Sequence, residues 1–166
     1  GYGGAAHGGV GGYVIGHGTF AREPYGSFTN PMSLGSGSWT PGGGAIVLVV
    51  GGGIAINGTI SANGGVSSGG AGGGAGGAIN ITAGTLTGTG TIRARGGYNS
   101  WSGGGGGRIA LQGMTNDTFS GEIEVHGGNN GVRGMAGTIW LSPIRRSNLV
   151  IGNGGSYTNL RFGCDG

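Results

Sequence analysis

The side chains that could carry catalysis in this chain are few and widely spaced. It contains five acidic residues, of which Glu122 and Glu124 lie two positions apart. On an extended strand such a pair shares one face, with side-chain origins about 6–7 Å apart, and paired carboxylates can act as the acid and base of a glycosidase. Because Arg93 and Arg95 lie one repeat earlier, we expect solvated carboxylates beside arginines instead. We predict no catalytic residues and no enzyme activity.

Metal and nucleotide chemistry have weaker support still. The three histidines, His7, His17 and His126, are too dispersed in the sequence to predict a zinc site. The single cysteine, Cys164, excludes an internal disulfide and leaves a frayed thiol or an intermolecular disulfide as alternatives. The glycine runs lack the Lys-Ser/Thr of a phosphate-binding loop and precede no predicted helix. We therefore expect no cofactor and no bound metal.

Two aromatic residues, Tyr98 and Trp101, lie in the glycine-flanked segment YNSWSGGGGG. Such a pair can form a platform on which sugar rings stack, or it can pin a loop onto the body of the protein. Three N-glycosylation sequons begin at Asn57, Asn80 and Asn116, which suits a secreted protein. We therefore treat Tyr98 and Trp101 as candidate ligand-stacking residues, with surface glycans as the candidate ligand.

Composition separates this chain from several classes of glycine-rich protein. Glycine supplies 50 of 166 residues, only 8% of residues are charged, and the formal net charge is +3 without any lysine. Collagen is excluded because no Gly-X-Y period exists, and simple disorder because disordered chains are normally highly charged. The arginines form no dense basic patch and no long apolar run exists, so we expect neither nucleic-acid binding nor a membrane span. The first residue is Gly rather than Met, which predicts a processed or excised piece.

Short β-branched runs between the glycine clusters repeat along the chain. The isoleucines that open each unit, Ile46, Ile79, Ile109 and Ile139, are spaced by 33, 30 and 30 residues. A period of this length with two or three strands per unit is typical of one turn of a parallel β-helix, whereas helical repeats cannot tolerate so much glycine. We predict an all-β fold, a glycine-rich parallel β-solenoid of about four coils. A Gly/Pro-rich lead-in (1–41) would pack on the solenoid (42–166), whose repeats are 42–65, 73–97, 104–128 and 134–155.

Alternation along each predicted strand indicates which side chains face the core. The inward columns would be Ile46/Leu48, Ile79/Ile81, Ile109/Leu111 and Ile139/Leu141 in the first strands, and Ile60/Ala62, Ile92/Ala94 and Ile123/Val125 in the second. On the outer face, Arg93 would lie about 5 Å from Glu124 of the next coil, at the spacing of adjacent strands. We predict that they form an inter-coil ion pair worth less than about 1 kcal/mol.

The outer face of the first strands is unusually apolar. Residues 45–50 are apolar on both sides of the strand, and the outward positions include Val47, Val49, Ala110 and Trp140. Apolar outer strips of this kind are covered by another part of the chain or form association sites. Either the lead-in or another subunit would cover the strip, and these four residues are the candidate assembly face.

The glycine tract from Gly64 to Gly77 has two interpretations. It could be a flexible loop, or it could pack as an ordered polyglycine layer, because uncharged Gly, Ala and Ser residues let backbones approach without steric cost. In such a design glycine would also turn corners at positive φ.

The order of these segments resembles the glycine-rich solenoid repeats of very large secreted or surface proteins, mainly bacterial. The matching segments cover nearly the whole chain after Tyr25 and include GGGAIVLVV, INGTISANGG, GGAINITAGTLTGTGTI, TFSGEIEVHGG and NLVIGNGG. What the resemblance implies is an extracellular or cell-surface β-helix that serves as a stalk, adhesin segment or fibre, without catalytic residues.

Three functions therefore compete. The leading hypothesis is a structural subunit that assembles with itself or with neighbouring repeats, because neither end of the sequence shows the helix or charged cap that normally protects solenoid strand edges. The second is an adhesin or binding module for surface glycans or for ice, although the alternating threonines of TLTGTGTI recur in no other unit. The third is a polyglycine-sandwich receptor-binding tip, which the intervening β-branched strands disfavour.

Overall fold

The computed structural model describes residues 3–13, 16, 22–66, 68–70, 72–141, 152–153 and 156–157. Within these residues the chain forms strands, turns and extended segments, and no helix, which confirms the all-β class. The strands are β1 (Ala45–Ala55), β2 (Thr59–Ser61), β3 (Ala78–Thr87), β4 (Thr91–Arg93), β5 (Arg108–Gln112), β6 (Asn116–Asp117), β7 (Glu122–Glu124), β8 (Thr138–Leu141), β9 (Gly152–Asn153) and β10 (Ser156–Tyr157).

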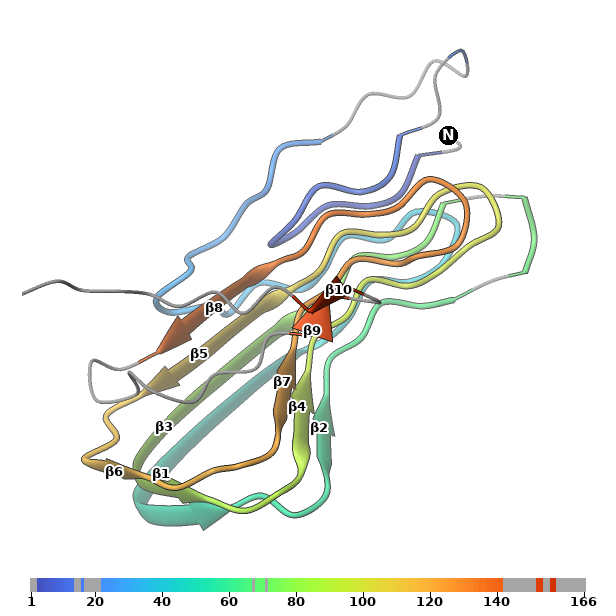
Figure 1. Cartoon of the computed structure of the whole chain (residues 1–166). Helices are drawn as coiled ribbons and strands as arrows, with labels where there is room; N and C mark the ends of the chain where they lie inside the picture. Colours follow the sequence, from blue (N-terminus) through green and yellow to red (C-terminus); the bar gives the residue numbers. More distant parts are fainter. Residues whose placement is uncertain are drawn as a thin grey trace, which may run out of the picture.

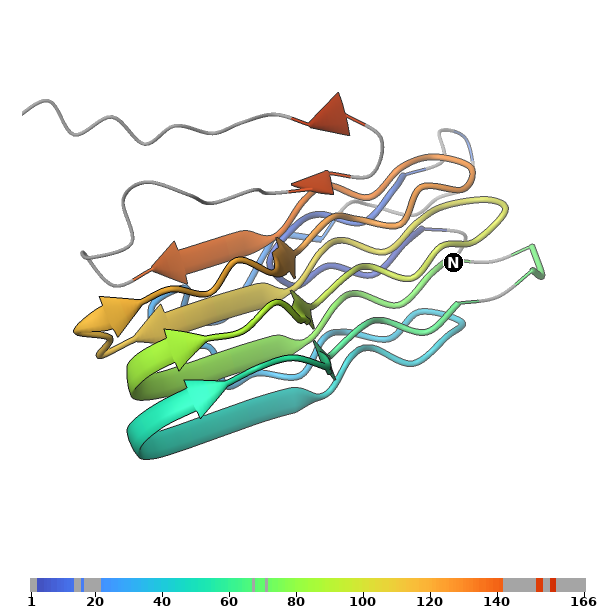
Figure 2. The same ribbon diagram turned by 60° about the horizontal axis from the view of Figure 1, so that its bottom comes forward.

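Two parallel sheets organise the chain into a β-solenoid, as predicted (Figure 1). The larger sheet has the order β1–β3–β5–β8 with β6 beside β3, and the smaller sheet has the order β2–β4–β7. The chain alternates between the sheets and completes about three turns before β8 opens another (Figure 2). The predicted count of about four coils is therefore slightly too high, and most of the second half of the fourth predicted repeat lies outside the described residues.

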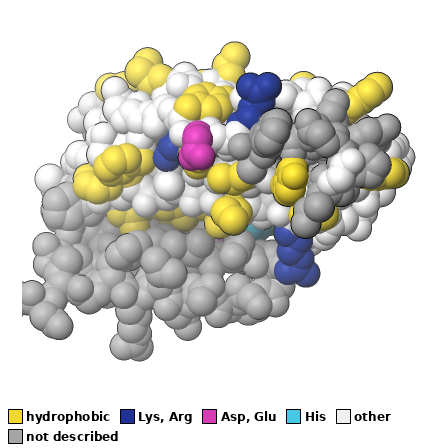
Figure 3. All heavy atoms as spheres, turned by 90° about the horizontal axis from the view of Figure 1, so that it is seen from above, with side chains coloured by type: hydrophobic (Ala, Val, Ile, Leu, Met, Phe, Trp, Pro, Cys, Tyr) yellow, Lys and Arg dark blue, Asp and Glu magenta, His cyan; other side chains and the backbone are white. Residues whose placement is uncertain are grey.

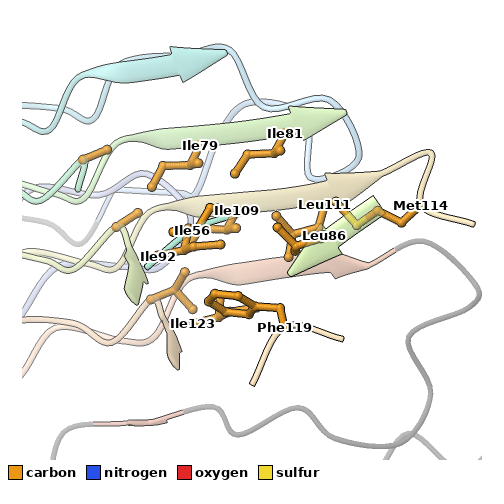
Figure 4. Close-up of a cluster of buried hydrophobic side chains, with 13 residues drawn as sticks. Ile56, Ile79, Ile81, Leu86, Ile92, Ile109, Leu111, Met114, Phe119 and Ile123 are labelled. Carbon is orange, nitrogen blue, oxygen red and sulfur yellow. The ribbon is translucent and has the colours of Figure 1, made fainter. Parts of the chain in front are cut away.

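Strand pairing aligns equivalent residues of successive coils, as the repeat spacing predicts. Two isoleucine columns result: Ile46–Ile79–Ile109–Ile139 in the larger sheet and Ile60–Ile92–Ile123 in the smaller. The side chains of the two sheets point towards one another, with Met114 and Phe119 of the third coil beside them (Figure 4). Full burial of an isoleucine side chain stabilises a fold by about 1.5–3 kcal/mol, so these columns hold the strand half of each coil together.

Glycine turns some of the corners of the solenoid. Gly88 joins β3 to β4 with φ of 110°, and Gly113 follows β5 with φ of 72°. Both values lie in the left-handed region, which other residues rarely adopt. Glycine therefore turns corners at positive φ, as expected, but only a few of the described glycines do so.

Many glycines lie instead in arms that extend from the strands, to the right in Figure 1. Return arms leave the smaller sheet, outgoing arms lead into the larger sheet, and a tip joins each return arm to the next outgoing arm. The return arms are 62–65, 94–97 and 125–128, and the outgoing arms are 72–77, 102–107 and 132–137. The described residues of the tips between them are 66, 68–70, 98–101 and 129–131. Parallel bridges from Gly72 to Ser102 and from Ser102 to Val132 join successive outgoing arms.

Each outgoing arm forms backbone hydrogen bonds in three directions. The amides of residues 73–77 donate in turn to the next outgoing arm, to the return arm that leads into the same tip, and to the lead-in. The bonds run from Gly73 to Ser102, Gly76 to Gly105, Gly74 to Gly65, Gly77 to Ala62 and Ala75 to Ser36, with N–O distances of 2.7–3.3 Å. Residues 103–107 repeat this order one coil later. A hydrogen-bond pattern that recurs every three residues matches the three residues per turn of a polyproline II helix, and we interpret the arms as a lattice of such helices.

Glycine is required in this lattice by close approach rather than by left-handed backbone. None of the glycines at 72–77 or 103–107 has a positive φ. A Cβ added at Gly76, Gly97 or Gly105 would lie well within 3.0 Å of a backbone oxygen of a neighbouring segment. Of the two interpretations of the tract from Gly64 to Gly77, the ordered layer is the one that its described residues adopt.

The described lead-in residues pack on the solenoid in two places. Residues 3–12 lie against the outgoing arms, where Gly105 N donates to Ala5 O at 2.8 Å and Met135 N donates to Val10 O at 2.7 Å. Residues 25–31 cross the outer face of the larger sheet, and Arg108 Nε donates to Tyr25 O at 2.8 Å. The lead-in therefore adds a third layer to the arms and a cover to part of the sheet.

Candidate assembly surface

The charged side chains of the described residues do not converge on a site. No group of three His, Cys, Asp or Glu side chains among them is placed to hold a metal ion. Glu122 is exposed whereas Glu124 is buried, so the two carboxylates do not share one environment. Figure 3 shows how sparsely charged side chains are spread over the face seen from above. His17 and Cys164 lie outside the described residues.

The predicted ion pair between Arg93 and Glu124 is replaced by a different one. The strand register places Arg93 opposite Glu124, as expected. However, the guanidinium that contacts the Glu124 carboxylate belongs to Arg95, while Arg93 Nε lies 3.4 Å from Ser61 Oγ. The Glu124 side chain is only 11% exposed. A carboxylate buried to this extent needs a partner on its buried side, and Arg95, at the start of the return arm, provides it.

The candidate assembly face divides into a covered part and an open part. Ala110 is fully buried and therefore cannot contact a second molecule, which corrects the prediction for that residue. The cause is the lead-in, which contacts both ladder neighbours of Ala110. Asn80 Nδ2 donates to Asn30 Oδ1 at 2.6 Å, and the Trp140 ring lies 5.6 Å from that of Phe28.

The open part of this face belongs to β1. Val47 is 45% exposed and Val49 is 79% exposed. Trp140 at the other end of the ladder also remains partly exposed beside Phe28. Of the two alternatives predicted from the sequence, cover by the lead-in is realised over the middle of the strip, and the β1 end of the strip remains exposed.

The open edge of the first coil, formed by β1 and β2, is the most distinctive surface of the molecule. Both strands end their sheets, and they lie at the bottom of Figure 2. Ile46, Leu48 and Ile60 are only partly buried, whereas their partners one coil further, Ile79, Ile81 and Ile92, are fully buried. The hydrophobic core therefore reaches the solvent at this edge. This exposure is not an effect of a chain terminus, since 44 residues precede β1.

His7 is a buried polar residue of the lead-in that the sequence analysis did not single out. Its Nδ1 lies 2.8 Å from Gly76 O, and its ring centroid lies 4.9 Å from that of Tyr25. Burial lowers the pKa of His7, and the positive charge of Arg108 acts in the same direction, although the hydrogen bond to Gly76 opposes them. The neutral ring therefore donates from Nδ1 and fixes the lead-in to the outgoing arm. A lone histidine among glycines and alanines carries no periodic signal that would reveal this role.

Tyr98 and Trp101 lie on the same tip, 98–101, and both remain about half exposed. A Cβ added at Gly70, on the preceding tip, would lie 2.8 Å from Trp101 Nε1. The indole thus packs against the neighbouring tip, as expected for an aromatic residue that pins a loop. Its partial exposure also keeps the sugar-stacking interpretation open.

Taken together, the parallel sheets and the glycine lattice define a parallel β-solenoid with polyglycine arms. No helix among the described residues is long and apolar enough to cross a membrane. Comparisons with protein-family models, with curated proteins and with solved structures found no match to this chain. Its function must therefore be argued from its own surfaces.

Proposed function

We propose that this protein is a structural module of an extracellular fibre or surface stalk, whose solenoid continues into a second copy through the open edge. The observation that supports this proposal is the exposure of the hydrophobic core at β1 and β2. A solenoid needs a polar cap at such an end to remain a separate soluble particle. A second copy that stacks there would cover Ile46, Leu48 and Ile60, just as neighbouring coils cover the equivalent residues of the second coil.

The open edge also lacks the features by which proteins prevent edge-to-edge association. Natural edge strands carry charged residues or proline, and β1 and β2 contain neither. The bulge between Val50 and Gly53 leaves residues 45–50 as a regular edge. Residues 1–92 contain only Arg22 and Glu23 as charged residues, so little electrostatic repulsion opposes contact. Because the two ends of a solenoid differ, stacking through them is heterologous and produces an open fibre.

Electron microscopy of the purified protein over a concentration series tests the proposal. We expect filaments of the wild-type chain, and their loss in Val49→Lys, which places a charge on the open edge. Leu34→Lys is the matched control, because Leu34 is a 64% exposed apolar residue of the lead-in that belongs to neither β1 nor β2. Monodisperse wild-type protein at high concentration, or filaments of Val49→Lys equal to those of the wild type, would overturn the proposal.

A second candidate function is a surface adhesin or glycan-binding module, which the partial exposure of Tyr98 and Trp101 favours. Aromatic rings can stack on the apolar faces of sugars. Glycan-array binding of the wild type, compared with Tyr98→Ala, tests this candidate without removing the packing of Trp101. Binding that is equal in the two proteins would exclude Tyr98 as a stacking residue.

A further inference from the structure

The three N-glycosylation sequons of the chain lie in different surroundings, and the structure separates them. Asn80 is 5% exposed, in the middle of β3. Its Nδ2 donates to Asn30 Oδ1 at 2.6 Å, and its Oδ1 accepts from Gln112 Nε2 at 2.9 Å. A glycan on this nitrogen would break the bond to Asn30 and displace the lead-in from the sheet. The folded protein cannot carry a glycan there.

Asn57 has the opposite environment. It lies in the turn between β1 and β2, and both Asn57 and Thr59 of its sequon are exposed. The next residue, Gly58, has open space around the position of a Cβ. The Asn57 Oδ1 accepts from Thr89 N of the second coil at 3.3 Å, so the carboxamide leans away from the open edge. A glycan on Asn57 is therefore compatible with stacking at that edge.

Asn116 provides a second accessible acceptor. It lies in β6, where it pairs with Thr85, and both Asn116 and Thr118 are exposed. Residues two apart on an extended chain lie on the same side, so the amide and the hydroxyl that define the sequon face the solvent together. Asn57 follows β1 and Asn116 lies in β6, and both elements lie at the end of the solenoid opposite the glycine arms (Figure 1).

We propose that Asn57 and Asn116 are N-glycosylation sites and that Asn80 is not. The donor would be an oligosaccharide linked through pyrophosphate to a polyprenyl lipid. The asparagine Nδ2 forms a bond to C1 of the first sugar, the bond from C1 to the pyrophosphate oxygen breaks, and the lipid pyrophosphate leaves as Nδ2 loses one proton. The bulky polar groups would cover one corner of the solenoid. This inference rests on the extracellular routing contained in the proposed function, but not on fibre assembly.

The test is secretion of the full chain, behind a signal peptide, from a eukaryotic host that performs N-glycosylation. Enzymatic release of the glycans in ¹⁸O-water, followed by peptide mass mapping, should find labelled aspartate at positions 57 and 116 and unmodified asparagine at position 80. Thr59→Ala and Thr118→Ala should each abolish one of the two electrophoretic mobility steps. Ser120→Ala, which removes an exposed hydroxyl outside any sequon, is the matched control and should retain both steps.

Secreted, folded protein with both sites unoccupied, or with a glycan on Asn80, would overturn the inference. Circular dichroism of each variant identifies folded material before the sites are read. Because fibre formation is measured separately on unglycosylated protein, failure of the glycan sites and failure of the assembly proposal remain distinguishable.

Discussion

In the strand half of each coil, neighbouring turns are joined by strand ladders and by columns of isoleucine and leucine that fill the space between two sheets. In the glycine half, neighbouring turns are joined mainly by backbone hydrogen bonds, in three directions, and few side chains lie between them. The strand half depends on the removal of apolar surface from water. The glycine half depends on hydrogen bonds between backbones that approach one another closely.

The two halves should therefore respond oppositely to a change in side-chain volume. A core of side chains loses stability when atoms are removed, because a cavity remains. A lattice of glycines loses stability when atoms are added, because backbone oxygens occupy the space that a side chain needs. The following predictions are ordered from the largest expected effect to the smallest.

The largest effect is expected from one methyl group in the lattice. A Cβ on Gly105 would meet backbone atoms of Gly9 and Val10, none of which can move without separating the lead-in from the arm. We expect Gly105→Ala to lower the free energy of unfolding by more than about 4 kcal/mol, beyond ordinary overpacking. Gly52→Ala is the matched control, because nothing lies within 4 Å of its added Cβ, and it should change stability by less than about 1 kcal/mol. Chemical denaturation gives the free energy of unfolding of both variants. Equal losses of stability in the two would contradict the close packing of the glycine lattice.

Removal of volume should matter most in the middle of the strand half. Ile109 is fully buried between the sheets, so Ile109→Ala should cost about 3 kcal/mol. Ile46 occupies the same column at the open edge, where it is only partly buried. We expect Ile46→Ala to cost less than half as much in the monomer, as measured by thermal or chemical denaturation. Equal costs would mean that the first coil is covered in solution.

A smaller effect should identify the arginine that matters for Glu124. Arg95→Gln would leave a buried carboxylate without its charged partner and should cost about 1–2 kcal/mol, less than a fully buried pair because the Arg95 side chain is 32% exposed. Arg93→Gln, the same change on the other candidate, should cost less than about 0.5 kcal/mol. Denaturation at low and high salt measures both, and a larger loss in Arg93→Gln would contradict the observed pairing.

The smallest effect at neutral pH concerns His7. Because its pKa is lowered in the folded chain, the ring is neutral there, and its contribution to stability is fully present above the usual pKa of 6.5. That contribution is lost as the pH falls below 6.5 and through the lowered pKa, since protonation places a charge in a buried position and, to a smaller extent, near Arg108. Unfolding midpoints between about pH 8 and pH 5 should show this decline. His7→Gln can still donate to Gly76 O but cannot be protonated, so its unfolding midpoint should fall less with decreasing pH. If the pH profile were unchanged, the loss of stability at low pH would belong to other groups.

The sequence predicts the strand half well because its signals are local. Alternating aliphatic residues and a spacing of 30–33 residues determine which side chains face inward and which residues pair, and columns such as Ile79–Ile109 follow directly. The glycine half carries no such signal, since identical residues do not reveal their partners. Contacts such as Asn30 with Asn80, or His7 with Gly76, join positions 50 and 69 residues apart and depend on the path of the lead-in. Arg95 replaces Arg93 as the partner of Glu124 for a similar reason, because strand alternation ends where the arm begins.

The tips of the coils are where the repeat changes its length most. Each outgoing arm takes seven residues from the bridge position to the core isoleucine, as from Gly72 to Ile79 and from Ser102 to Ile109. The tips between the fixed arms contain six, four and three residues in successive coils. The tips thus differ in length while the register of the arms stays the same. The same positions should accept grafted peptide epitopes, so that the solenoid could serve as a display scaffold with one variable loop per coil.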